Sequence, residues 1–495
     1  MQNQSCRTKS ETFATRIRFP FFIFCFALCI SAHAQPQLLP AGYRVETIET
    51  PEGVDFEVGG IAFGPNSSLL AATRHGDIWR LHDGRWSLFA EGLHEPLGLW
   101  VDPGSGEVYL AQRPELTRLV DTDRDGRADR YETVCAGWGF SGNYHEYAFG
   151  PVRDSIGNFY VTLNLSHSER GRVRNSVMGK DAALRGWCVQ ITPDGRLVPL
   201  ASGMRSPAGI GISRQDEIFY TDNQGDFNAT SALYHVQPGR FFGHPNALAD
   251  DPRFAGRELD TVPLEELDAM RSLPAVWIPH GELGNSPGEP IFDDTGGKFG
   301  PFAGQMFLGD QTKSNLIRIC LEKVGGEYQG AVFQFVAGLD SGVVRNAFAP
   351  DGSLYVGMTA RGWGAIGGKP FGLQRIVYDA ATMPFEMHSV SVTRRGFDIT
   401  FTAPVDAGAA DPQRYLIRHW TYRYQPDYGS PKVGESFVIP QKATISPDGR
   451  TVHLELPLLA KRVYQLLLVN VTSTSGQAPT TPTAYYTLNR LRDEE

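Results

Sequence analysis

The chain has 495 residues, of which 20% are charged and 41% are hydrophobic, and its formal net charge is −9. An acidic chain without a basic stripe is a poor partner for nucleic acid, so we expect no nucleic-acid partner. The 54 glycines and 33 prolines are typical of a fold with many short strands and tight turns.

Residues 1–34 have the features of an export signal rather than of a folded segment. Arg16 and Arg18 precede an apolar stretch over residues 19–30, and residues 31–34 end in the A-x-A pattern of a cleavage site. The apolar stretch is shorter than the roughly 20 residues that a membrane-spanning helix needs. We therefore expect no stable membrane insertion and a periplasmic or secreted location after cleavage of the signal peptide.

A short phrase recurs along residues 35–380. Each copy has an apolar run, a turn that carries Gly or Asp-Gly, and a second apolar run. The clearest copies occupy residues 59–74, 96–113, 147–162, 207–222 and 346–357. Antiparallel hairpins that repeat at intervals of roughly 40–60 residues indicate a radial or stacked β architecture, which gathers its binding loops at one end of a central channel.

The segment 121–132 matches a twelve-residue calcium loop, with Gly126 at the sharp turn. The predicted metal ligands are Asp121, Asp123, Asp125, Arg127, Asp129 and Glu132. Residues 116–120 before the loop have the pattern of a strand, so we expect Ca²⁺ to stabilise a connection between strands. The alternative is a solvated turn whose three arginines neutralise its carboxylates.

His145 lies just before the apolar run of the third copy, at the end of the repeat where propeller loops face the channel. Its ordinary pKa near neutrality would allow the imidazole to accept a hydroxyl proton, and the alternative is a structural histidine. Arg205, Lys313 and Arg345 occupy similar positions in later copies. The three cations could together hold a polyanionic ligand, or each could form an isolated surface ion pair.

Two longer insertions separate copies of the phrase. Residues 166–186 are polar and basic. Residues 250–273 hold the clearest helical pattern of the chain, because Leu264, Leu267 and Met270 fall on one face. Outside this pattern we expect strands and turns.

Residues 381–495 have a different character, with apolar and polar residues in alternation at 389–393, 397–401 and 451–456. This pattern indicates a β-sandwich of the immunoglobulin-like or fibronectin-like class. No cluster of His, Cys or paired carboxylates marks a site there. Three cysteines follow the signal peptide, Cys135, Cys188 and Cys320, and the sequence leaves open a disulfide between the first two or buried thiols.

Several of these segments together resemble the PQQ-dependent glucose/sorbosone dehydrogenase family. The segments are residues 91–99, His145 ahead of 149–151, residues 203–207 and residues 349–356. The resemblance covers roughly residues 40–380 and implies an all-β chain, with a six-bladed β-propeller at 35–380 followed by the sandwich at 381–495. Residues 484–490 also resemble the C-terminal segment of large secreted dehydrogenase-like bacterial proteins.

The resemblance implies a cofactor, pyrroloquinoline quinone (PQQ), together with Ca²⁺. His145 would be the base that takes a hydroxyl proton as hydride passes from a sugar or aldose-like substrate to the quinone. Arg205, Lys313 and Arg345 would hold the quinone oxygens, and residues 225–226 lie near the family's calcium ligands. A separate electron acceptor would then be needed, because the chain has no haem-attachment motif.

The chain also departs from the family's site pattern. Ser206 stands where the family has Asn, Val343 where it has a second Arg, and Leu93 near the position of an expected Gln. One alternative is therefore a non-catalytic propeller that binds carbohydrate or protein. A further alternative is a calcium-dependent lactonase, for which Asn143, Asn223 and Asn285 are the candidate metal ligands.

Overall fold

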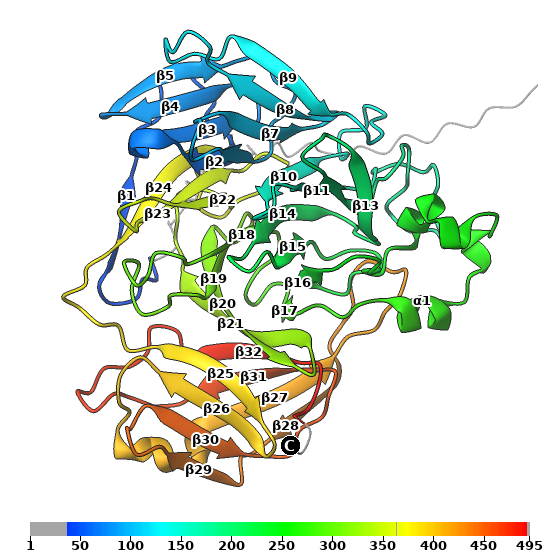
Figure 1. Cartoon of the computed structure of the whole chain (residues 1–495). Helices are drawn as coiled ribbons and strands as arrows, with labels where there is room; N and C mark the ends of the chain where they lie inside the picture. Colours follow the sequence, from blue (N-terminus) through cyan, green and yellow to red (C-terminus); the bar gives the residue numbers. More distant parts are fainter. Residues whose placement is uncertain (1–36, 363, 493–495) are drawn as a thin grey trace, which may run out of the picture. The chain divides into compact units, whose positions relative to one another are not determined.

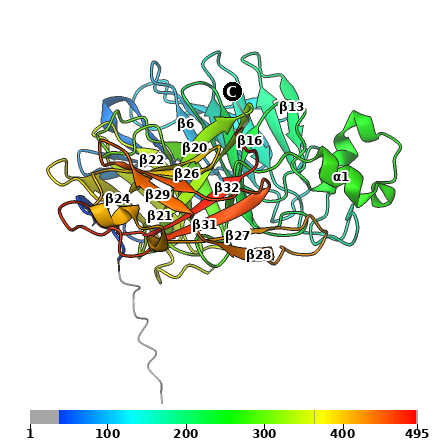
Figure 2. The same cartoon turned by 90° about the horizontal axis from the view of Figure 1, so that it is seen from below.

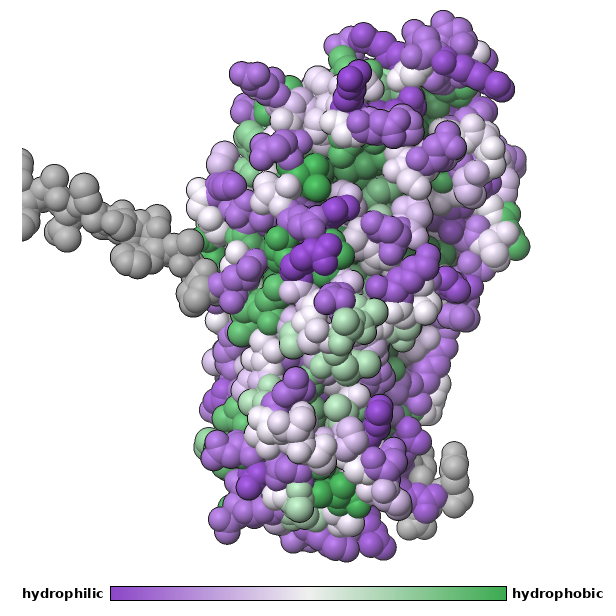
Figure 3. Space-filling view, turned by 90° about the vertical axis from the view of Figure 1, so that its left-hand side faces the viewer, coloured by the Kyte–Doolittle hydropathy of each residue, from purple (hydrophilic) through white to green (hydrophobic). Residues whose placement is uncertain are grey.

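The structure is a computed structural model that describes residues 37–362 and 364–492. The expected export signal, residues 1–34, lies outside the described residues. No helix in the described part of the chain is both long enough and apolar enough to cross a membrane. On the face shown in Figure 3, apolar atoms gather in small areas between polar residues.

The first four blades each consist of four strands that follow one another in the sequence and pair as antiparallel neighbours (Figure 1). These strands are β2 (Val58–Phe63), β3 (Leu69–Thr73), β4 (Ile78–His82), β5 (Arg85–Ala90), β6 (Leu99–Val101), β7 (Val108–Gln112), β8 (Glu115–Val120), β9 (Arg130–Cys135), β10 (Ala148–Arg153), β11 (Phe159–Leu163), β12 (Trp187–Ile191), β13 (Leu197–Ser202), β14 (Pro207–Ile212), β15 (Ile218–Asp222), β16 (Ser231–Val236) and β17 (Val276–Ile278).

Blades five and six complete the ring, and blade six takes its fourth strand from the start of the described chain. Blade five has β18 (Pro287–Phe292), β19 (Met306–Asp310), β20 (Asn315–Val324) and β21 (Glu327–Val336), and blade six has β22 (Val343–Phe348), β23 (Leu354–Thr359) and β24 (Phe371–Tyr378). β1 (Tyr43–Thr47) pairs with β24, with Tyr43 opposite Tyr378. The ring is therefore closed by hydrogen bonds between its two ends.

The six inner strands β2, β6, β10, β14, β18 and β22 contact one another in a closed cycle. Their backbones approach so closely that a Cβ atom on Gly59 would lie 2.1 Å from the carbonyl oxygen of Pro96. A glycine is required where two backbones meet in this way, which explains the glycines in the first half of the repeated phrase. The predicted six-bladed β-propeller is confirmed.

The predicted C-terminal β-sandwich is also confirmed, and one of its sheets is continuous with blade five. The sheets contain β25 (Met387–Thr393), β26 (Gly396–Phe401), β29 (Lys442–Ile445) and β30 (Thr451–Glu455), and β27 (Tyr415–Thr421), β28 (Val433–Val438), β31 (Arg462–Leu468) and β32 (Thr483–Leu488). β21 pairs with β32, so that one eight-stranded sheet runs from the propeller into the sandwich.

The hydrophobic core of the sandwich follows this shared sheet. Phe333 on β21 is buried in the same cluster as Phe397 and Tyr464 of the sandwich. Residues 34–495 group into one compact unit. The predicted division of the chain at residue 380 therefore stays a prediction, because strand pairing and packing continue across it.

The two insertions lie between strands, as the sequence predicts. Residues 166–186 connect β11 to β12, and the second insertion carries α1 (Leu264–Met270), whose Leu267 is buried. This insertion projects from the side of blade four (Figures 1 and 2). Short 3-10 turns complete the secondary structure: Pro65–Ser67, Pro245–Asp250, Pro252–Phe254, Leu259–Thr261, Ala407–Ala410 and Pro412–Arg414. Cys135, Cys188 and Cys320 are free thiols.

Candidate functional site

A small polar recess lies at the end of the channel where the inner strands begin, and we call it the mouth. Its volume is about 70 Å³, and residues from all six blades line it. In five blades the lining includes the polar residue that comes at or shortly after the end of the second strand: Arg74, Asn164, Asn223, Gln311 and Arg361. One position of the repeat therefore supplies most polar groups of the mouth.

His145 lines the mouth and is buried. Its Nδ1 lies 2.8 Å from the carbonyl oxygen of Leu165. Because a carbonyl only accepts, Nδ1 carries the proton and Nε2 keeps its lone pair. Burial, with a smaller contribution from the charge of Arg205, lowers the pKa of His145 to about 4. The imidazole is therefore a neutral hydrogen-bond acceptor at pH 7.

Ser206 lies next to the unprotonated ring nitrogen of His145, and two asparagines contact Ser206. The hydroxyl oxygen of Ser206 lies 3.3 Å from His145 Nε2. The amide nitrogens of Asn164 and Asn223 donate to the same hydroxyl at 3.4 and 3.5 Å. The amide oxygens of both asparagines are buried, and neither has a hydrogen-bond partner among the described residues. Two asparagines that line the mouth thus have unused acceptor capacity.

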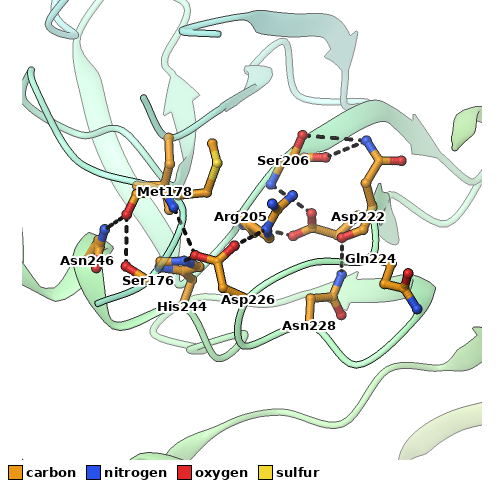
Figure 4. Close-up of polar contacts among 12 residues, drawn as sticks. Ser176, Met178, Arg205, Ser206, Asp222, Gln224, Asp226, Asn228, His244 and Asn246 are labelled. Atoms are coloured by element: carbon orange, nitrogen blue, oxygen red, sulfur yellow. Dashed lines mark hydrogen bonds and ion pairs between the residues drawn. The ribbon is translucent and has the colours of Figure 1, made fainter. Parts of the chain in front are cut away.

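Arg205 forms a buried ion pair instead of lining the mouth. Its Nε donates to Asp226 Oδ1 at 2.6 Å, while Asp226 Oδ2 accepts from His244 Nε2 at 2.9 Å and from the amide of Met178 at 3.0 Å (Figure 4). Burial alone would raise the pKa of Asp226, but the neighbouring His244 and Arg205 hold this pKa well below its usual range. The Arg205 charge is therefore already balanced within the protein.

Hydrogen bonds to Asp222 fix the loop that carries Arg205. Its carboxylate accepts from the amides of Arg205 and Ser206 at 2.9 and 2.8 Å (Figure 4). Burial raises the pKa of Asp222 to about 6. A Cβ atom on Gly225 would lie 1.9 Å from Arg205 Nε, so only glycine lets the guanidinium lie against this loop. Backbone and side chain therefore fix Arg205 in one position.

Arg345 crosses the channel at the floor of the mouth. Its Nε donates to the carbonyl oxygen of Gly59 in blade one at 2.7 Å, and its Nη1 donates to that of Ala208 in blade four at 2.9 Å. Its guanidinium carbon lies 4.8 Å from the ring centroid of Phe149 in blade three. Burial lowers the pKa of Arg345 to about 10. The side chain thus connects blades on opposite sides of the channel.

Lys313, the third predicted cation, is not among the residues that line the mouth. Its Nζ donates to the carbonyl oxygen of Gly281 at 2.8 Å in an exposed position. Of the residues that the resemblance implies, the structure brings His145 and Arg345 into the mouth and leaves Arg205 and Lys313 outside its lining.

A cluster that the sequence analysis missed ties the first three blades together at the mouth. The carboxylate of Glu95 accepts from Arg74 Nε at 2.9 Å and from Arg113 Nε at 2.7 Å. Both guanidinium groups lie over the ring of Tyr147, at 5.4 and 4.7 Å. Arg74 and Arg113 each follow the second strand of their blade, so an alignment of the repeats with one another would have found them.

A loop of the sandwich, between β27 and β28, packs against the blade-four loops that hold Arg205 and Gly225. The Tyr428 ring lies 5.2 Å from the guanidinium carbon of Arg205. The amide of Gly429 donates to the carbonyl oxygen of Gly225 at 2.9 Å, and the amide of Phe227 donates to that of Gln425 at 3.0 Å. Nothing in the sequence pattern indicated that the C-terminal sandwich would reach this site.

The predicted calcium loop connects β8 to β9 and extends into β9. None of its residues lines the mouth. Carboxylate oxygens of Asp121, Asp123 and Asp129 lie within 4.8 Å of one another. Asp121 Oδ1 is buried without a hydrogen-bond partner in the described structure. The Glu132 carboxylate is paired with Arg118 and Arg130. Three of the six predicted ligands are therefore grouped around one point.

Comparison with solved structures shows which folds this one is similar to. An oxidoreductase described as a glucose dehydrogenase, from Thermus thermophilus, is 22% identical, covers 68% of this chain and 100% of its own, and has a TM-score of 0.51. The holo form of the PQQ domain of pyranose dehydrogenase from Coprinopsis cinerea is 13% identical and also has a TM-score of 0.51. The match covers 69% of this chain and 97% of that domain. These likenesses show the fold, a propeller similar to those of PQQ-dependent sugar dehydrogenases.

Comparison with sequences gives a family assignment. No curated protein matches the chain. A family described as "Domain of unknown function (DUF7133)" matches residues 81–358. The match begins in blade one and ends in blade six, and it covers more than half of the chain. The chain therefore belongs to the DUF7133 family.

Proposed function

We propose that the mouth binds the hydroxylated edge of a carbohydrate or a related polyol, without a bound quinone. The observation that carries this proposal is the pair of buried amide oxygens, on Asn164 and Asn223, that have no donor among the described residues. Buried acceptors without a partner are costly, and neighbouring hydroxyl groups of a sugar would satisfy both. The Ser206 hydroxyl, which donates to His145 Nε2, accepts from the amide nitrogens of both asparagines.

The size of the mouth limits what can enter it. A recess of about 70 Å³ is several times smaller than the roughly 300–1,000 Å³ of a site that encloses a whole small molecule. This is the size of a diol edge and not of a whole sugar ring. We therefore expect the ring to lie outside the recess, against the rim.

Two exposed aromatic rings lie next to residues of the two loops that carry His145 and Ser206. Tyr144, 59% exposed, lies beside His145, and Tyr428, 57% exposed, lies over Arg205. A large exposed ring next to a polar recess is a typical element of a small-molecule site, where it packs against the apolar face of the ligand. A sugar ring presents such a face, which favours carbohydrate over a simple diol.

The protonation state of His145 favours binding over catalysis. A general base works best when its pKa lies near the working pH. The pKa of His145, about 4, makes its imidazole a weak base at pH 7. Its Nε2 accepts a hydrogen bond from the Ser206 hydroxyl, but it has little tendency to remove the proton.

The residues of the mouth do not fit PQQ, which the resemblance implies. A site for a cofactor of that size usually has about 300 Å³ or more, against about 70 Å³ here. The Arg205 guanidinium is neutralised by Asp226, and that of Arg345 donates to backbone carbonyls of the channel wall. Quinone-dependent oxidation of a sugar stays a hypothesis that rests on the fold and on the place of His145.

The calcium-dependent lactonase has less support from the mouth. The amide oxygen of Asn143 accepts from the backbone amides of His145 and His167. That of Asn285 accepts from the amide of Gly281. Only Asn223, of the three candidate ligands, has an oxygen without a partner among the residues that the structure describes.

Isothermal titration with a panel of monosaccharides and polyols tests the proposal. We expect at least one to bind, and we expect N164A and N223A each to weaken it about tenfold, since each loses one hydrogen bond. K313A is the matched control, because Lys313 does not line the mouth. Titration with PQQ and Ca²⁺ should give no binding. Tight binding of PQQ, or no binding of any polyol, would overturn the proposal.

We also propose a structural Ca²⁺ in the loop 121–132, held by Asp121, Asp123 and Asp129. The unpartnered, buried Asp121 Oδ1 fits a hard cation that needs several oxygen ligands. The ion would add oxygen contacts that join β8 to β9. It would take no part in binding at the mouth.

A periplasmic or secreted location is our proposal for the mature chain. It rests on the export pattern of residues 1–34. Expression with and without these residues, followed by fractionation and N-terminal sequencing, tests it. We expect export only with the segment present and a mature N-terminus at residue 35.

A further inference from the structure

A second and larger cavity lies at the opposite end of the channel, and we call it the far cavity. Its volume is about 550 Å³. The later residues of the inner strands of all six blades line it, whereas the mouth is lined by their first residues. Its apolar wall includes Ile61, Phe63, Leu99, Ile210, Ile212 and Phe348. A volume of about 300–1,000 Å³ is usual for a site that binds a small molecule.

Arg345 separates the two cavities. Its guanidinium, held by the carbonyl oxygens of Gly59 and Ala208, forms the floor of the mouth. The next residue on the same strand, Asn346, lines the far cavity. A ligand in the far cavity would therefore not compete for the groups of the mouth.

Two polar groups meet at the inner end of the far cavity. The side-chain amide nitrogen of Asn346 donates to the carbonyl oxygen of Glu289 at 2.8 Å. Among the described residues, the Glu289 carboxylate accepts only one long contact, from the Asn346 backbone amide at 3.4 Å. Asn346 is 3% exposed, and its amide oxygen has no partner in the described structure. A carboxyl group and an amide oxygen therefore lie together with unused acceptor capacity.

The Glu289 carboxylate lacks an ion-pair partner, and its raised pKa is consistent with this. Within residues 37–362 and 364–492, no cation lies at ion-pair distance from its carboxylate. Burial raises the pKa of Glu289 to about 7, although the charge of Arg345 opposes the shift. A buried carboxyl group without an ion-pair partner, on the wall of a cavity of this size, is typical of a ligand site.

The charged residues at the rim are already engaged. Arg153 pairs with Asp102, Asp294 pairs with Arg214, and Lys298 donates to the carbonyl oxygen of Pro350. Arg153 and Asp294 are each neutralised by an ion pair, whereas Lys298 donates to a neutral carbonyl oxygen, which satisfies one of its donors and does not balance its charge. The unsatisfied polar groups of the far cavity are thus confined to its inner end.

We propose that the far cavity binds a small amphipathic amine, with its hydrocarbon body on the apolar wall and its ammonium group on Glu289 and Asn346. An ammonium group carries three donors and no acceptor, which suits a carboxylate and an unpartnered amide oxygen. The hydrocarbon body supplies the hydrophobic part of the affinity. This site is independent of the proposed carbohydrate site.

Three probes of equal chain length test the assignment by isothermal titration: n-hexylamine, 1-hexanol and hexanoate. We expect n-hexylamine to bind at least tenfold more tightly than hexanoate, with 1-hexanol between them. E289Q should weaken n-hexylamine about tenfold and leave 1-hexanol within about twofold. H145Q, at the mouth, is the matched control and should leave all three affinities unchanged.

A second variant covers the case in which E289Q does not fold. I212W places a large ring in the cavity and should weaken both n-hexylamine and 1-hexanol. Equal affinity for hexanoate and n-hexylamine would overturn the proposal. So would an unchanged affinity for n-hexylamine in folded E289Q, or unchanged affinities for both probes in I212W.

Discussion

The hydroxyl oxygen of Ser206 lies 3.3 Å from Nε2 of His145, and both residues are buried. The other ring nitrogen of His145 donates to the Leu165 carbonyl oxygen. The imidazole is therefore fixed in one tautomer and is surrounded by neutral hydrogen-bonding groups. Protonation of this ring would place an unpaired charge inside the protein.

His145 should therefore make the chain less stable in acid. Its pKa is about 4 in the folded state and lies near 6.5 in an unfolded chain, so the unfolded state binds the proton first as the pH falls. The free energy of unfolding should decrease between pH 6.5 and 4, by up to about 3 kcal/mol. Urea denaturation of wild type and H145Q at several pH values measures how much of the pH dependence of the free energy of unfolding comes from His145. H82Q removes an exposed histidine and should have the same pH dependence as wild type. An equal pH dependence for H145Q and wild type would contradict the prediction.

Glu289 should act in the opposite direction. Its pKa is about 7 in the folded state, above the ordinary value of 4.5, so the folded state holds the proton more tightly. The contribution of Glu289 to wild-type stability should therefore decrease as the pH rises from 4.5 to 7, by up to about 3 kcal/mol, and it opposes the contribution of His145. E289Q should be more stable than wild type at pH 8 and similar to it at pH 4.5. Denaturation at both pH values checks this, and a variant that is less stable at pH 8 would refute it.

The buried pair of Arg205 and Asp226 should be strongly coupled. Removing one partner leaves the other as an uncompensated buried charge, which costs about 3–5 kcal/mol. We expect R205M and D226N each to destabilise the chain by such an amount, and the double variant to cost less than their sum. A double-mutant cycle from urea denaturation measures the coupling. Additive losses would show that the two side chains act independently.

Removal of Ca²⁺ should lower the melting temperature if the loop 121–132 holds the ion. We expect EDTA to lower the Tm of the wild type and to have no effect on D121N, which lacks the buried carboxylate oxygen. D125N is the matched control, since Asp125 is outside the group of three residues whose carboxylate oxygens lie within 4.8 Å of one another. It should keep the Ca²⁺-dependent shift, whereas loss of the shift in D125N would favour the wider ligand set of the sequence prediction.

The sheet shared by blade five and the sandwich should make the two regions unfold together. Separate unfolding would expose the β21 edge and the buried Phe333. Differential scanning calorimetry of the mature chain should show one transition with equal calorimetric and van't Hoff enthalpies. Two well-separated transitions would mean that the shared sheet does not couple the regions.

The sequence predicted the local features well, because hairpins and turns depend on neighbouring residues. The copies at 59–74 and 207–222 correspond to β2–β3 and β14–β15, and the helical pattern at Leu264, Leu267 and Met270 corresponds to α1. The family resemblance supplied the blade number. These parts of the fold need only periodicity and turn chemistry.

The features that the sequence could not predict all depend on packing between distant segments. The pairing of β21 with β32 joins strands that have no common local pattern. The position of Arg205 gives no sign that Asp226 will neutralise it, since its partner is set by how the loop folds. Asn164 looked like any polar residue after a strand, and only its unpaired oxygen marks it as part of a site.

The closure of blade six has a consequence for synthesis on the ribosome. β1 emerges first, yet its partner β24 emerges only after the other blades, so that Tyr43 must wait for Tyr378. β21 likewise has no outer neighbour until β32 is released near the C-terminus. Unpaired strand edges attract other chains. The edges of β1 and β21 thus stay unpaired for as long as β24 and β32 have not been synthesised, and during that time they are open to pairing with other chains.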